Sequence, residues 1–529
     1  MTRCQTTLAL WVLPVTFTGL LLAMLLASLP LWQVFNLDPD YYYLLNGLRM
    51  VEGLAPTDLS HPGTPVQVII AAVLRLMHPF ADADAIVDAV LHDPEGHLLA
   101  ATLALYPLVT AGLYLLGRAF LNCTGSLWPA LLAQSSPFLS MIIPKFALHP
   151  KPEPLLVVAG ALMAAAAIAA ARSHPPRDRH AVALGIALGF GVALKMQFVA
   201  LGLVPLLLLN RRQLLLVYPA AALASFLLFV APALPSYPFF MEWWGRILTH
   251  SGAYGSGAAG VADAGIYPRA ILKIFGSKLV FSATLATALA VLAGYWRLRR
   301  RGLWPADPLA RLLAGLVLAQ LATVALVAKQ SAAHYLIPAL MLTGPTLALL
   351  WMMTRPRSGA GKIHRRAWTA VSVLLVVLSI PAAWRQSAEL AGWSRTRQNF
   401  DMGRFQACAK IFFDSASALS YALQRGDMNA QVRYSARLAG WMPADEYTWF
   451  TNDHFWWPNS LMQWNKKIAL DTILARHPCV VFRGSQPWTL PPRLEAEHPG
   501  LAFDDQCQVG EETLYTRGVR CDGRPVQAP

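Results

Sequence analysis

Long apolar runs separated by short polar connections dominate the first 384 residues of the chain. About 20 apolar residues, each rising 1.5 Å along a helix, cross about 30 Å of hydrocarbon, so runs of this kind predict membrane-spanning helices. We expect about eleven spans, near 8–30, 97–117, 125–143, 153–172, 180–194, 196–209, 213–234, 270–296, 308–328, 333–354 and 367–384. The two short runs beside Lys195 predict a paired or broken element. The first run is too long for a cleaved signal peptide and predicts an uncleaved span.

The composition agrees with a polytopic membrane protein and disfavours a nucleic-acid-binding one. Hydrophobic residues make up 56% of the chain and charged residues 14%, whereas a soluble domain carries about 25% charged residues. The net charge of +14 comes from 43 basic and 29 acidic residues. Because the basic residues cluster between apolar runs, they indicate orientation in the membrane. The chain has no zinc-finger spacing and no Walker-type loop, so nucleic acid is not an expected partner.

The orientation depends on the short apolar segment 66–77, which Arg75 interrupts. Its length favours an interfacial or re-entrant helix on the outer face rather than a span. The basic clusters at 297–301 and 355–366 then fall inside, and the N-terminus is cytoplasmic. If the segment crossed the membrane, every later connection would change sides and the positive-inside rule would be violated.

The same parity places residues 385–529 outside, as a small α/β domain distinct from a membrane domain at 1–384 with a first outer loop at 31–96. Strand-like runs at 479–484 and 513–515 lie in this tail. Four of the six cysteines lie here too: Cys408, Cys479, Cys507 and Cys521. An even number in an outside domain predicts one or two disulfides. Four unrelated thiols are the alternative, and the sequence leaves the pairing open.

Acidic, basic and aromatic side chains gather on the predicted outer face from five separated segments. The candidate residues for catalysis are Asp38 and Asp40, and those for substrate or donor binding are Tyr42, His61, Lys151, Glu153, Lys195, Arg246, His334 and Tyr335. A carboxylate can take the proton of an attacking hydroxyl. Cations can hold a departing phosphate as its negative charge develops. Aromatic side chains in the interface suit a polyprenyl chain and the face of a sugar.

Each of these candidates has a simpler interpretation. Asp38 and Asp40 can cap the helix predicted from Tyr41, and the three consecutive tyrosines can form an interfacial aromatic belt. Lys145 and Lys151 can extend toward lipid headgroups, and His334 can be an ordinary surface histidine. Trp243 and Trp244 fit an aromatic belt better than a sugar platform. Two neighbouring acids could also hold a divalent cation.

Five short motifs resemble the GT-C class of glycosyltransferases, which includes protein mannosyltransferases, the aminoarabinose transferase and oligosaccharyltransferase. They are LDPDYYYLLNGLRMVEG, HPGTP, KPEPLL, GVALKMQF and HYLIP, and the resemblance covers about residues 1–355. It implies a GT-C fold and an acidic catalytic residue in the first outer loop, matched by Asp38 or Asp40. This chain has Asp-Pro-Asp where many relatives have Asp-Glu, and Glu153 stands where relatives often have Asp.

The resemblance implies an inverting glycosyltransferase at the outer face of the inner membrane. Its donor would be a polyprenyl-phosphate-linked sugar, and its acceptor a lipid, a glycan or a protein. A transporter or lipid flippase is the alternative from another class. The sequence shows no internal repeat, and most charges lie at the ends of spans, which favours the transferase. The sequence leaves open the sugar, the acceptor and any need for a metal, and assigns no cofactor.

Overall fold

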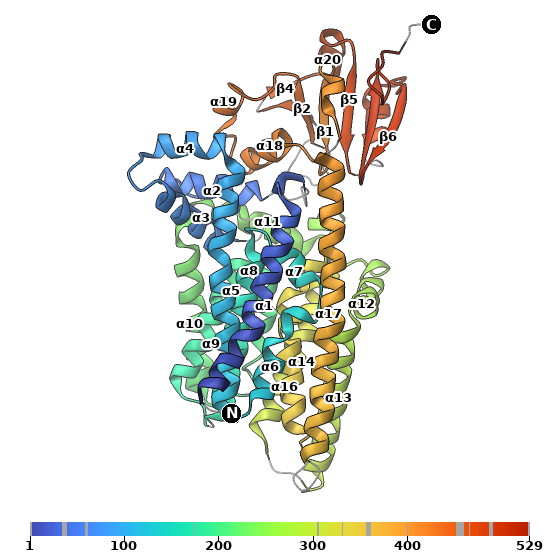
Figure 1. Cartoon of the computed structure of the whole chain (residues 1–529). Coiled ribbons are helices and arrows are strands. Elements are labelled where there is room, and N and C mark those ends of the chain that lie inside the picture. Colours follow the sequence, from blue (N-terminus) through green and yellow to red (C-terminus); the bar gives the residue numbers. More distant parts are fainter. Residues whose placement is uncertain are drawn as a thin grey trace. The chain divides into compact units, whose positions relative to one another are not determined.

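The chain folds into two compact and mainly helical units. This computed structural model describes residues 3–33, 40–58, 62–173, 175–255, 257–303, 306–330, 332–355, 361–398, 400–450, 460–464, 466–485 and 490–526. Unit 1 comprises Met1–Ala23, Leu59–Val66 and Thr102–Gln386, and unit 2 comprises Met24–Asp58, Gln67–Ala101 and Ser387–Pro529. Figure 1 labels the helices and strands of both units.

Seven helical segments in the described part of the chain are long and apolar enough to cross a membrane. They are Gln5–Ser28 within α1 (Arg3–Ser28), α5 (Pro94–Thr124), α8 (Pro152–Arg172), Arg212–Thr249, α13 (Leu279–Arg300), α14 (Pro308–Ala328) and Ala333–Met353. The predicted span at 367–384 lies within the longer helix α17 (Gly361–Gln398). The chain is therefore a multi-pass membrane protein, and the predicted fold class, helical spans with a small C-terminal α/β part, is confirmed.

Two of the long segments are composite. Arg212–Thr249 joins α10 (Arg212–Val230), the 3-10 helix η4 (Ala231–Ser236) and α11 (Tyr237–Thr249). Ala333–Met353 joins the 3-10 helix η6 (Ala333–Leu336), α15 (Ile337–Met341) and α16 (Thr343–Met353). After α11 come the 3-10 helix η5 (Ala253–Gly255) and α12 (Ile266–Ser277).

Other predicted spans are built from short pieces. The run at 125–143 forms α6 (Leu127–Gln134), the 3-10 helix η2 (Ser136–Phe138) and α7 (Ile142–Ala147). The run at 180–194 lies in α9 (Asp178–Leu194), but the run at 196–209 begins with η3 (Met196–Leu203), an eight-residue 3-10 helix. The break at Lys195 agrees with the predicted paired or broken element, and the run after it begins as a 3-10 helix rather than as an α-helical span. A 3-10 stretch of this length is uncommon and often marks a functional break in a helix.

Helix α9 lies very close to α10 in unit 1. A β-carbon added at Gly189 would lie 2.2 Å from the backbone oxygen of Ala222, so only glycine allows this approach. Small residues of this kind let helices pack tightly where lipid supplies no hydrophobic drive between them. The packing holds α9, and with it the break at Lys195, against a neighbouring helix.

The segment at 66–77 is a short helix and not a span. Helix α3 (Thr64–Met77) has 14 residues, about 21 Å at the rise of an α-helix, which is less than the thickness of the hydrocarbon layer. That it lies on the outer face stays a prediction.

Unit 2 contains a seven-stranded mixed sheet. Its strands are β1 (Ala409–Phe413), β2 (Glu446–Phe450), β3 (Ser460–Gln463), β4 (Lys466–Lys467), β5 (Val480–Gly484), β6 (Asp505–Val509) and β7 (Glu512–Arg517). The order is β4-β3-β2-β1-β5-β7-β6, with β1 parallel to β2 and β5 and the outer pairs antiparallel. Its other elements are the 3-10 helix η7 (Met402–Phe405), α18 (Leu419–Asn429), α19 (Ser435–Leu438), α20 (Leu470–Arg476) and α21 (Leu490–Glu497).

Helices of the first predicted outer loop belong to the same unit as the sheet. They are α2 (Tyr41–Val51) and α4 (Ala83–His92). The carboxylate of Glu52 accepts from Arg433 at 2.9 Å and from the Tyr434 hydroxyl at 2.8 Å. A β-carbon on Gly426 of α18 would lie 2.9 Å from the Tyr41 backbone oxygen. These contacts place the first-loop helix α2 against the C-terminal domain within unit 2. Their position on the outer side and the domain boundary at 384 stay predictions.

The four tail cysteines form two disulfides. Cys408–Cys479 joins the starts of β1 and β5, and Cys507–Cys521 ties β6 to the C-terminal turn. Both bridges agree with the sequence prediction and fit an oxidising compartment.

We expect the two bridges to differ in their effect on stability. The chain between Cys408 and Cys479 is longer (sequence separation 71) than that between Cys507 and Cys521 (14). By loop-closure entropy, replacing the first pair by serine should lower the free energy of unfolding by about 4 kcal/mol and replacing the second by about 3 kcal/mol. Denaturant unfolding of the full chain in detergent measures both, and non-reducing peptide mapping checks the pairing. A Cys408–Cys507 peptide would contradict it.

Candidate functional site

A buried ion pair lies at the helix break of unit 1. Lys195 follows α9 with extended backbone and precedes η3. Its Nζ lies 2.6 Å from Oε1 of Glu153, and the two side chains are 2% and 3% exposed. Removing two charges from water costs several kcal/mol per ion, so a pair at this depth is weak evidence for stability and stronger evidence for a role in the site.

The start of α8 explains the position of Glu153. Lys151 is the N-cap residue with extended backbone, and Pro152 occupies the first helical position, where its missing N–H costs nothing. Glu153 therefore lies in the first turn, where the helix dipole favours a negative charge. Its second oxygen, Oε2, is buried without a hydrogen-bond partner among the described residues. That oxygen remains available as an acceptor.

Aromatic side chains enclose the lysine end of the pair. Lys195 Nζ lies 5.0 Å from the ring centre of Tyr335, within the range of a cation–π contact. The hydroxyls of Tyr335 and Tyr254 are 3.3 Å apart, and the ring of Tyr254 stacks on that of Trp243. His334 packs edge-on against Tyr335. These aromatic contacts link η6, η5 and α11 around one cation.

Tyr254 holds an uncommon backbone conformation. Its φ is 53°, in the left-handed region that disfavours bulky residues. Strained backbone of this kind persists where surrounding structure fixes it, and it clusters at functional sites. Tyr254 and Tyr335 also line a cavity of about 320 Å³ together with Asp263, Tyr267, Lys329 and Gln330. A cavity of this size can admit part of a ligand beside the cation.

Unit 1 brings together several of the residues predicted from sequence. Lys195, Glu153, Tyr335 and His334 are joined by the contacts above, and Lys151 lies on the same connection as Glu153. Lys151 is 9% exposed, so it does not extend freely into a headgroup layer. The ring of His334 packs on Phe146 as well as on Tyr335, so it is not an isolated surface histidine. Arg246 lies on α11 one turn after Trp243.

Asp40 and Tyr42 of the first loop belong to unit 2. Asp38 and His61 lie outside the described residues. Asp40 occupies the N-cap position of α2 and is 4% exposed, but its side chain makes no capping hydrogen bond. Capping alone therefore does not account for a carboxylate buried at this position.

The three tyrosines after Asp40 do not form a lipid-facing belt, so that alternative was wrong. Tyr41, Tyr42 and Tyr43 are buried within unit 2. The Tyr41 hydroxyl donates to Glu95 at 2.6 Å, and the Arg425 guanidinium lies 5.6 Å from the Tyr42 ring centre. A role for Tyr42 in substrate binding stays a prediction.

Sequence reasoning did not single out Glu95 or place Tyr254 in the site. Glu95 Oε2 also accepts from the Leu31 backbone amide at 2.8 Å. An acid at the start of a long apolar run was the available signal for Glu95. Tyr254 lies within a glycine-rich stretch, and no spacing in the sequence connects it to Tyr335. Among the described residues, no group of three or more His, Cys, Asp or Glu side chains gathers as a metal site.

Comparison with known proteins gives one structural likeness. No family model matches the chain, and no curated protein matches it. Among solved structures, the chain is similar to ArnT from Cupriavidus metallidurans, crystallised with undecaprenyl phosphate bound. The two are 13% identical, the match covers 95% of this chain and 97% of that one, and the TM-score is 0.42.

Breaking the Lys195–Glu153 pair should cost far more than replacing it. We expect Lys195→Met alone to lower the free energy of unfolding by about 3–5 kcal/mol, because it leaves Glu153 buried and unpaired. The double variant Lys195→Met with Glu153→Leu should recover most of that loss. Unfolding in mixed micelles, arranged as a double-mutant cycle, measures the coupling. Additive losses in the double variant would show that the pair is not coupled.

Proposed function

We propose that this protein is a membrane glycosyltransferase. It moves a sugar from a polyprenyl-phosphate donor to a lipid, glycan or protein acceptor at the outer face of the inner membrane. The observation that carries the proposal is the buried Lys195–Glu153 pair with Tyr335 at the helix break of unit 1. A cation in an apolar, water-poor setting suits a lipid-borne phosphate, and the GT-C-like order of the sequence motifs supports the same reaction.

The reaction needs one base and one site for the leaving phosphate. A first-loop carboxylate, Asp38 or Asp40, takes the proton of the acceptor hydroxyl as its oxygen bonds to the anomeric carbon. The bond from that carbon to the phosphate oxygen breaks, and the electron pair leaves with the polyprenyl phosphate. A single displacement of this kind inverts the anomeric centre.

Lys195 would stabilise the negative charge that develops on the leaving phosphate. Glu153 would orient Lys195 in the absence of donor. Lys151 and His334 would add further donors near the phosphate, and the aromatic side chains around Tyr335 would exclude water from it.

A flippase is the alternative, because transporters also place charges at broken helices. It would carry a lipid across the membrane without forming a glycosidic bond. Product analysis in a sealed-vesicle assay separates the two functions: a new glycosidic product supports the transferase, and translocated but unmodified lipid supports the flippase.

Replacing the catalytic carboxylate should abolish most transfer and leave donor binding intact. Asp38→Asn and Asp40→Asn are made separately, and we expect one of them to lower kcat by about 10²–10⁴-fold. The matched control is Asp82→Asn, since Asp82 lies in the same loop and caps α4 through the Ala85 amide. Full activity in both first-loop variants would remove these acids from the mechanism.

Removing the Lys195 cation should weaken donor binding. Because a hydrogen bond to a charged group contributes about 1.5–3 kcal/mol, Lys195→Met should raise the Kd for a short-chain polyprenyl phosphate about tenfold or more. Lys273→Met on α12 is the matched control, as Lys273 is exposed. An unchanged Kd in the Lys195 variant, with the protein folded, would place the phosphate elsewhere.

A further inference from the structure

In the sheet of unit 2, the segments that follow the neighbouring strands β1 and β5 run to opposite faces. Strand β1 is followed by α18, whose Tyr421 packs with Phe412 on one face of the sheet. Strand β5 lies beside β1 and is followed by α21, whose Leu490 and Leu494 pack in the core of the opposite face. The connections after β1 and β5 therefore cover opposite faces of the sheet.

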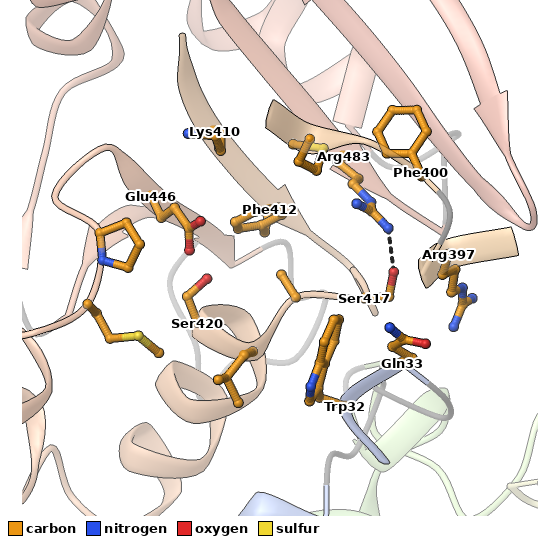
Figure 2. A pocket seen from close by; sticks show the side chains of 15 residues that line it. Trp32, Gln33, Arg397, Phe400, Lys410, Phe412, Ser417, Ser420, Glu446 and Arg483 are labelled. Atoms are coloured by element: carbon orange, nitrogen blue, oxygen red, sulfur yellow. Dashed lines mark hydrogen bonds between the residues drawn. The ribbon is translucent and has the colours of Figure 1, made fainter. Parts of the chain in front are cut away.

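A cavity of about 510 Å³ occupies the α18 face of this sheet. Cross-strand register places Lys410 opposite Glu446 and Phe412 opposite Arg483, so these four side chains share the face. Figure 2 shows Arg397 and Arg483 on one side of the cavity, Glu446 and Ser420 on the other, and Phe412 and Trp32 between them. The volume falls within the range of small-ligand sites.

Two of the three cations that line the cavity have acidic partners. Arg483 Nη2 lies 2.6 Å from Oε2 of Glu512, and Lys410 pairs with Asp445. Arg397 forms no ion pair among the described residues and is only 9% exposed, and its Nε is buried without a hydrogen-bond partner there. A buried guanidinium N–H without an acceptor is costly, and a bound anion would supply the acceptor that Nε lacks.

A second donor lies beside Arg397. The Gln33 side-chain oxygen accepts from the Ser394 hydroxyl at 3.0 Å. The side-chain nitrogen of Gln33, Nε2, is a hydrogen-bond donor, and Gln33 also lines the cavity. Arg397 and Gln33 together suit an oxygen anion rather than a cation.

The rest of the cavity suits a sugar ring. Trp32, Phe400 and Phe412 give apolar surfaces on which the C–H face of a pyranose can pack. Burial raises the pKa of Glu446, while Lys410 on β1 favours its charged form and its neighbour Asp445 opposes it. The carboxyl oxygens of Glu446 can accept hydrogen bonds from sugar hydroxyls.

We propose that this cavity binds a hexose-sized sugar that carries one carboxylate, with the carboxylate at Arg397 and the hydroxyls toward Glu446. Arg397 is the one cation lining the cavity that forms no ion pair among the described residues, and the carboxylates of Glu512 and Glu511 already favour its charge from a greater distance, so a ligand with a single negative charge suffices. A phosphate ester carries about −1.5 to −2 charges at neutral pH and would leave the excess uncompensated. That this acidic sugar belongs to the acceptor glycan rests on the proposed function, whereas the site itself does not.

The test is direct binding to the purified full chain in lipid nanodiscs, measured by saturation-transfer NMR and titration. Methyl glucuronide should bind, and its neutral isostere methyl glucuronamide should bind about tenfold more weakly or not at all. Arg397→Gln should weaken the glucuronide about tenfold or more, and Arg397→Lys should retain part of the affinity. The matched control is Arg476→Gln on α20, because Arg476 is exposed and its helix packs on the opposite face.

Three outcomes would overturn the site. They are equal binding of the glucuronide and the glucuronamide, tighter binding of glucose 6-phosphate than of the glucuronide, and unchanged affinity in a folded Arg397→Gln protein. If the Arg397→Gln variant fails to fold, the comparison of methyl glucuronide with methyl glucuronamide on the wild-type chain still tests the site. Glycosyl transfer by the first-loop variants is measured in a separate assay. The sugar-binding cavity and the proposed reaction can therefore be refuted independently of each other.

Discussion

The ion pair between Lys195 and Glu153 is the constraint around which unit 1 is arranged. Two charges 2.6 Å apart and almost fully buried survive in an apolar setting only when the backbone fixes both ends. At one end, α9 stops and a 3-10 helix begins, which releases Lys195 from helical geometry. At the other end, Pro152 starts α8 and leaves Glu153 in its first turn. The aromatic side chains around Tyr335 then keep water from the pair, which strengthens the attraction between the two charges.

In unit 2, the C-terminal domain holds the long loop after the first span in one conformation. The loop after the first span has no core of its own, and its helix α2 is buried on nearly every face. The C-terminal domain supplies the missing partner: the Arg49 guanidinium donates to the Ala430 carbonyl at 3.0 Å, and the Glu52 carboxylate accepts from Arg433 and Tyr434. A mobile loop would present Asp40 in many positions, whereas this packing fixes one. For the general base proposed above, preorganisation of this kind would lower the entropy cost of the reaction.

Some of this could be predicted from the sequence because it depends on local pattern. The long apolar runs, the shortness of the segment at 66–77 and the broken element at Lys195 all follow from spacing along the chain. The burial of the tyrosines does not, since α18, which packs against Tyr41 and Tyr42, lies more than 300 residues away along the chain. Nor does the link from Tyr254 to Tyr335, which depends on a left-handed residue in a glycine-rich loop. The connections that leave β1 and β5 toward opposite faces of the sheet could not be predicted either. Short strands give only a weak pattern in the sequence, and the order of strands in a sheet is a tertiary property.

The two buried cations, Lys195 and Arg397, bear on function for the same physical reason. A protein in which a buried charge and its partner are replaced by hydrophobic residues of similar volume is often as stable as the original, or more stable. Folding alone therefore gives no reason to keep either cation, and natural proteins retain costly groups where activity requires them. The two differ in what surrounds them. Lys195 has a carboxylate and a tyrosine ring in a membrane unit, which suits a lipid-borne phosphate that displaces or shares the carboxylate. Arg397 borders a cavity with sugar-sized volume and aromatic walls in a disulfide-linked domain, which suits a water-soluble glycan. A transferase that joins a lipid-borne donor to a polar acceptor needs one site of each kind.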